Sequence, residues 1–136
     1  MDTVRPVEYF YVVVPDKPGE GARALDALRE AGVNLLAYSG FPAGKRAQLD
    51  FVPEDSAAFK QVARQAKWKV KGPKRAFLIQ GDDRPGACAA ILDKLAGAKI
   101  NVTAMDAVAA GAGRWAAILW VKPAAFKKAA AILGAA

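Results

Sequence analysis

Two copies of a short motif bring an acid, a cation and a glycine together in the same order. Asp-Lys-Pro-Gly at 16–19 recurs 67 positions later as Asp-Arg-Pro-Gly at 83–86. A helical pattern follows each glycine, and the first N–H groups of a helix lack intrahelical partners and suit a carboxylate. The acids suit either capping of those N–H groups or pairing with an ammonium group. The candidate ligand-binding residues here are Asp16, Lys17, Gly19, Asp83, Arg84 and Gly86.

A second pair of polar positions recurs at the same offset. Asn34 and Leu35 correspond to Asn101 and Val102, each pair just after a helical pattern. An Asn amide both donates and accepts hydrogen bonds, as a zwitterionic ligand requires. The structural alternative is a turn residue that tolerates left-handed geometry. All four positions are included in the predicted ligand site.

The composition excludes several classes of chemistry. The chain has no histidine, so it has neither a Ser-His or Cys-His nucleophile pair nor a His-liganded metal site. Its single cysteine, Cys88, cannot form an internal disulfide, and it falls in an apolar helical stripe typical of core residues. We expect no catalytic residues, no metal and no cofactor, and therefore a protein that is not an enzyme.

The net charge and the hydropathy of the chain limit the classes of partner that it can have. The 136 residues include 20 Lys and Arg against 13 Asp and Glu, a net charge of +7 that favours anionic partners. With 54% hydrophobic residues the chain can build a packed core. The first residues do not resemble a secretory signal, and no run approaches a membrane span. We expect a cytoplasmic protein with no membrane partner.

The 67-residue offset extends to the elements that must position these residues. An apolar strand at 9–14 is followed by an amphipathic helix at 21–28, a strand from 33, a strand at 47–52 and a helix at 59–66. The same order recurs with strands at 76–80, from 100 and at 115–121, and helices at 88–95 and 126–133. The chain is therefore predicted to contain two units, 1–71 and 72–136.

The expected fold class is α+β, with two ferredoxin-like β-α-β-β-α-β units in tandem, each with its helices on one face of an antiparallel sheet. Residues 68–71 would be the fourth strand of the first unit, with Lys67, Lys69 and Lys71 protecting a sheet edge. The second unit ends without a fourth strand. The segment 3–9, the strand 68–71 or a second copy of the chain would cover the exposed edge of strand 76–80, and we favour a homodimer.

These motifs in this order resemble the ACT domain, a small regulatory module that binds amino acids in enzymes of amino-acid metabolism. The resemblance rests on Asp-X-Pro-Gly after a strand, and on Gly-Val-Asn-Leu at 32–35 and Lys-Ile-Asn-Val at 99–102. It covers nearly the whole chain twice. It implies a ligand site between paired domains, built from the loop after the first strand and the start of the second. With no catalytic domain attached, it implies a stand-alone tandem ACT regulator or sensor that binds an amino acid or similar carboxylate and acts on an unidentified metabolic enzyme.

The alternative is a nucleic-acid-binding protein that uses a basic ferredoxin-like sheet surface. RNA-recognition modules share this strand order and stack bases on aromatic residues of the third strand. Here the third strand of the first unit reads Ala-Gln-Leu-Asp-Phe-Val at 47–52, with an acid and no such motif. The sequence therefore favours the small-molecule regulator.

Overall fold

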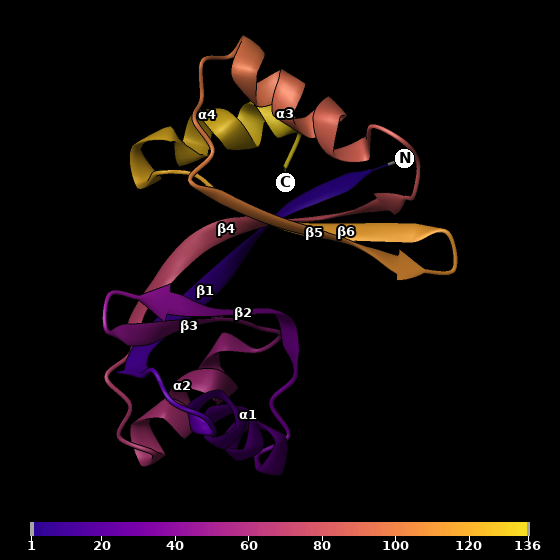
Figure 1. The fold of residues 1–136 in the computed structure, drawn as a ribbon. Helices are drawn as coiled ribbons and strands as arrows, with labels where there is room; N and C mark the ends of the chain where they lie inside the picture. Colours follow the sequence, from indigo (N-terminus) through magenta and orange to yellow (C-terminus); the bar gives the residue numbers. More distant parts are fainter. Residues whose placement is uncertain (1, 136) are drawn as a thin grey trace. The chain divides into compact units, whose positions relative to one another are not determined.

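The computed structural model describes residues 2–135, which form six strands and four helices of an α+β fold (Figure 1). The strands are β1 (Thr3–Pro15), β2 (Leu35–Ala43), β3 (Arg46–Pro53), β4 (Lys71–Asp82), β5 (Ala104–Gly111) and β6 (Arg114–Trp120). The helices are α1 (Glu20–Glu30), α2 (Ser56–Gln65), α3 (Ala87–Gly97) and α4 (Pro123–Leu133). The α+β class predicted from the sequence is confirmed.

The chain folds into two compact units whose limits differ from those of the sequence repeats. The N-terminal unit is Glu8–Lys74, and the C-terminal unit combines Met1–Val7 with Arg75–Ala136. The predicted boundary between 71 and 72 falls inside the continuous strand β4. The predicted outer limits, 1 and 136, lie outside the described residues.

In the N-terminal unit, β3 pairs antiparallel with β1 from Phe10↔Phe51 to Pro15↔Arg46, and on its other side with β2. Helices α1 and α2 cover one face of these strands (Figure 1). The apolar side chains on that face pack with the helices, and the rings of Phe10 and Phe51 lie 4.8 and 5.3 Å from that of Phe59. Packing between aromatic rings therefore holds α2 against the sheet.

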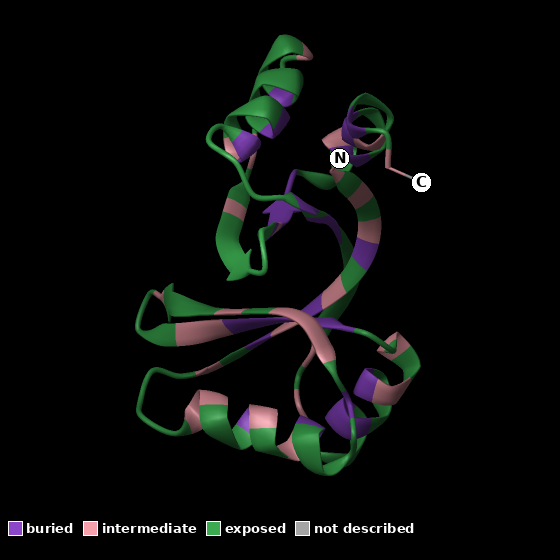
Figure 2. Ribbon diagram, turned by 90° about the vertical axis from the view of Figure 1, so that its right-hand side faces the viewer, coloured by how far each residue is buried: buried purple, intermediate pink, exposed green. Residues whose placement is uncertain are grey.

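The C-terminal unit repeats this arrangement with β4, β6 and β5, covered by α3 and α4 (Figure 1). Strand β6 pairs antiparallel with β4 and with β5. The buried residues lie between the helices and the strands (Figure 2). The rings of Phe77 and Phe126 stack at 4.4 Å, and the Arg75 guanidinium lies 4.0 Å from the centroid of the Phe126 ring.

Residues 75–135 supply three strands to the C-terminal unit, and the start of β1 adds to them. The first residues of β1 belong to the C-terminal unit, where β1 neighbours β4 and the Thr3 hydroxyl donates to the Gln80 carbonyl at 3.4 Å. Strand β1 is 13 residues long, so its two ends can serve different units. Of the coverings considered for the β4 edge, the segment that precedes Tyr9 provides one, and the edge no longer calls for a second copy of the chain.

The predicted fourth strand at 68–71 also changes. Residues 68–70 are irregular, and only Lys71 begins β4. The start of β4 lies against β1 within the N-terminal unit, since a Cβ on Gly72 would stand 2.8 Å from the Tyr9 carbonyl oxygen. Lys67 and Lys69 therefore precede the strand instead of protecting its edge.

No helix formed by residues 2–135 is long and apolar enough to cross a membrane.

Candidate functional site

The predicted helix starts are built on glycine in both units. Gly19 precedes α1 with φ 92° and Gly86 precedes α3 with φ 82°, a left-handed conformation that other residues rarely adopt. Neither the Asp16 nor the Asp83 carboxylate accepts a hydrogen bond from a helix amide of the described chain. The first amide groups of both helices are therefore left without side-chain caps.

A hollow of about 280 Å³ lies at the start of α3 in the C-terminal unit. Its wall combines the loop after β4 and the first turn of α3 with residues of β5 and β6. Small side chains of β5, Ala107 and Ala109, leave the space open. It is lined by Asp83, Arg84, Gly86, Ala87, Cys88, Ala89, Ala107, Val108, Ala109 and Trp115. Three predicted site residues, Asp83, Arg84 and Gly86, are thus brought together.

Arg84, a cation of this wall, is held by Asp2. Its Nη1 donates to Oδ1 of Asp2 at 3.1 Å and to the Asp82 carbonyl at 2.9 Å, and its Nη2 donates to Oδ2 of Asp2 at 2.9 Å. The hydrogen bond from Arg84 holds the pKa of the Asp2 carboxyl below its usual range. Arg84 is therefore an ordered guanidinium with a carboxylate partner.

The matching place in the N-terminal unit is occupied by a side chain. Tyr38 of β2 places its hydroxyl 3.0 Å from where a Cβ on Gly21 would stand and 3.2 Å from where one on Gly40 would stand. Gly21 and Gly40 correspond in the repeat to Cys88 and Ala107 of the hollow. Burial raises the pKa of the Tyr38 hydroxyl, which keeps it neutral. The two helix starts therefore differ in the space they offer.

The predicted Asn positions lie at the opposite ends of the helices. Asn34 and Leu35 follow α1 and line a second hollow of about 370 Å³ with Leu25, Leu28, Arg29, Gly32 and Val33. Asn101 and Val102 follow α3, and Val102 packs on the core. Because an 11-residue helix is about 16 Å long, one unit does not bring its Asn close to its Asp-X-Pro-Gly motif.

Asn34 makes contacts that fit a structural role. Its side-chain Nδ2 donates to Oε2 of Glu54 at 3.2 Å, and its main-chain carbonyl accepts from the main-chain N–H of Glu54 at 2.9 Å. Both hydrogen bonds tie the end of α1 to the segment that leads into α2. The amide nitrogen that a zwitterionic ligand would use is therefore engaged within the unit.

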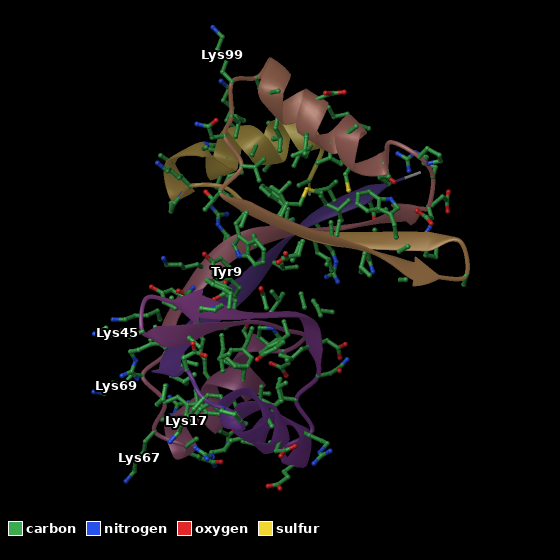
Figure 3. All side chains as sticks on the ribbon, in the orientation of Figure 1. Tyr9, Lys17, Lys45, Lys67, Lys69 and Lys99 are labelled. Atoms are coloured by element: carbon green, nitrogen blue, oxygen red, sulfur yellow. The ribbon has the colours of Figure 1, made fainter. Side chains whose placement is uncertain are left out.

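The lysines of the N-terminal unit form a separate feature. Lys17, Lys45, Lys67 and Lys69 project away from the core (Figure 3). Lys17 lies 3.8 Å from a carboxylate oxygen of Glu20, whereas within residues 2–135 no carboxylate lies within 4.0 Å of the other three. They are solvated loop charges.

Sequence reasoning missed Asp2, Gly81 and Trp115. Asp2 is separated from Arg84 by 82 positions, and neither Gly81 nor Trp115 belongs to a recurring motif. Cys88, which the sequence assigns to the core, is half-buried and contacts both the core and the hollow. None of the three missed residues follows a repeating pattern. Among the other residues that line the hollow, a pattern search could have found the small side chains of β5, which stand at alternate positions opposite the start of α3.

Comparison with solved structures finds proteins that share this fold. Protein BT0572 from Bacteroides thetaiotaomicron matches with a TM-score of 0.83 at 15% identity, over 96% of this chain and 88% of that chain. The ligand-free regulatory subunit of aspartate kinase from Thermus thermophilus matches with a TM-score of 0.64 at 18% identity, over 98% and 94%. The sequence matches no protein-family model and no curated protein. At these identities the likeness establishes a shared fold.

Proposed function

We propose that this chain is a non-catalytic regulatory protein whose C-terminal unit binds an amino acid or a similar small carboxylate. In this proposal the two units are tandem ACT domains of a cytoplasmic sensor that acts on a separate metabolic enzyme. The fold is shared with a regulatory subunit of aspartate kinase, which supports a regulatory role.

The observation that carries the proposal is the hollow at the start of α3. Its volume of about 280 Å³ is near the lower end of the roughly 300–1,000 Å³ of ligand pockets, which suits a small ligand. The wall includes the guanidinium of Arg84 and the uncapped first turn of α3, two groups that attract a carboxylate. Ala107 and Ala109 offer an apolar surface to the rest of the ligand.

The remaining predicted residues keep their place as proposals for a second site. Asp16, Lys17 and Gly19 surround the start of α1, where Tyr38 takes up the space. Asn34, Leu35, Asn101 and Val102 lie at the far helix ends. We therefore rank the C-terminal hollow first.

A thermal-shift screen against the twenty amino acids, followed by titration calorimetry, tests the proposal. A ligand at 100 times its dissociation constant should stabilise the fold by about 2.7 kcal/mol. Ala107→Leu, which fills the hollow, should abolish binding, while Ala110→Leu changes the same residue type in the same strand outside the hollow and should not. Binding that survives Ala107→Leu but is lost in Asn101→Ala would move the site to the other end of α3.

A further inference from the structure

The carboxylate of Asp2 is bound within the C-terminal unit by Arg84 and Trp115, which together form what we call the seat. Arg84 donates two parallel N–H···O hydrogen bonds of 3.1 and 2.9 Å to this carboxylate, which is the geometry with which arginine recognises carboxylates. Nε1 of Trp115 donates to Oδ1 of the same carboxylate at 3.2 Å. The Asp2 side chain is 14% exposed and Trp115 only 3%, whereas the Arg84 side chain is 42% exposed and keeps the seat accessible to solvent.

The backbone of β4 makes room for this carboxylate at Gly81. A Cβ there would overlap Oδ1 of Asp2 and stand 2.9 Å from Nε1 of Trp115. Gly81 is not among the positive-φ glycines, so its conformation does not call for glycine. Glycine is needed at this position because the Asp2 carboxylate fills the volume that a side chain would occupy.

The same two donors, Arg84 and Trp115, also line the neighbouring hollow. Asp2 occupies one N–H of Nη1 and one of Nη2, so a carboxylate ligand that takes these same two donors competes with Asp2 for the guanidinium. We propose that the seat is a carboxylate-binding site filled by the chain's own Asp2, and that a small carboxylate ligand binds there by displacing it. This proposal deepens the proposed function, on which the location of the ligand rests.

Displacement has a structural consequence because Asp2 precedes β1. The segment is also held by the pairing of β1 with β4, by the 3.4 Å hydrogen bond from Thr3 to Gln80 and by the packing of half-buried Val4 on the core. The first residues of a strand open at lower free-energy cost than its interior. Ligand binding at Arg84 therefore loosens residues 2–7 from β4, so that occupation of the site by the ligand changes the pairing of these two segments.

The indole N–H resonance of Trp115 reports on the seat directly. It is assigned by its loss in Trp115→Phe, and the full chain is titrated with sodium acetate against sodium chloride at equal ionic strength. Hydrogen exchange of the backbone amides of residues 3–5 and 7 is followed in parallel. We expect acetate, but not chloride, to shift the resonance saturably and to speed exchange of those amides.

Two variants change the seat in opposite ways. Asp2→Asn removes the charge that pairs with Arg84 and leaves the volume of the seat unchanged, whereas the added Cβ of Gly81→Ala fills the volume of the carboxylate, so that neither Asp2 nor acetate fits there. If the vacated state is populated to about 10% or less, Asp2→Asn should bind acetate tenfold or more tightly than the natural chain, and Gly81→Ala should not bind it. Arg84→Gln should abolish acetate binding. If Gly81→Ala does not fold, Asp2→Asn alone carries the comparison.

Equal acetate affinity in the natural chain and in Asp2→Asn would overturn the proposal. A parallel titration with glycine separates it from the proposed function. Glycine that binds in the hollow without speeding exchange of residues 3–7 supports the proposed function and overturns displacement. Acetate that displaces Asp2 when no amino acid binds supports the carboxylate seat and overturns the proposed function.

Discussion

The hydroxyl of Tyr38 stands 3.0 Å from the point that a Cβ on Gly21 would occupy. Tyr38 comes from β2 and Gly21 from the first turn of α1, so this approach closes the start of α1 against its sheet. The repeat places Met105 and Cys88 at the matching positions, where the C-terminal unit keeps a hollow. The two copies therefore differ at the start of their first helix, where Tyr38 approaches α1 and the C-terminal unit has a hollow.

This approach predicts the effect of adding a methyl group to α1. Alanine in place of a helical glycine usually stabilises by about 0.5–1 kcal/mol. Gly97→Ala in α3, whose Cβ would meet nothing within 4 Å, should show that gain in urea denaturation. Gly21→Ala should gain less or lose stability, because its Cβ crowds the Tyr38 hydroxyl.

Removing that hydroxyl completes the cycle. In a Tyr38→Phe background, Gly21→Ala should recover stability, with a coupling of about 0.5 kcal/mol or more. Additive effects of the two substitutions would show that the two groups do not constrain one another.

The Asp2–Arg84 pair predicts a pH dependence of stability. Because Arg84 lowers the pKa of Asp2 below the reference value of 3.8, the ionised carboxylate stabilises the fold at higher pH. That contribution is complete above about 3.8 and is lost as the pH falls through the lower pKa of the folded state. Since the Arg84 side chain is 42% exposed, solvent screening keeps this contribution small.

Urea midpoints of the natural chain and Asp2→Asn measure this contribution. The two curves should differ at pH 6 and converge as the pH falls below 3.8. A difference that stays constant down to the acid limit would mean that Asp2 acts through packing and not through its charge.

The strand formed by the first residues of the chain predicts a selective loss of protection. Deleting residues 2–7 removes the Asp2 ion pair, the packing of Val4 and the buried side chain of Val7, and burial of the two valines alone accounts for a loss of about 2 kcal/mol or more. Hydrogen exchange should accelerate in β4 residues 76–80, whose partner is gone. Exchange in β3, which pairs with β1 from Phe10 onward, serves as the internal control and should not change.

The basic charge predicts only non-specific contact with nucleic acid. A short single-stranded RNA should bind weakly, without sequence preference, and with an affinity that falls on a log–log salt plot by about 0.7 per phosphate contact. Lys67→Gln with Lys69→Gln should weaken that binding uniformly across sequences. Tight binding to one sequence at moderate salt would instead favour the nucleic-acid-binding alternative.

The sequence by itself determined the repeat, the order of the elements and the α+β class. These follow from local signals, since apolar periodicity marks each helix and strand and the recurring Gly19 and Gly86 mark the starts of α1 and α3. The candidate residues Asp83, Arg84 and Gly86 were found for the same reason, because they adjoin one another in the chain.

Only the tertiary structure decided which strand completes each unit and which helix start is open. The two ends of β1 and of β4 have strand patterns that fit either neighbour, and local propensity does not choose between them. The seat of Asp2 joins residues 82 positions apart through charge and an empty volume at Gly81, which no periodic pattern encodes. Pairing between distant strands and the filling of space depend on three-dimensional packing, so they emerge only when the whole chain has folded.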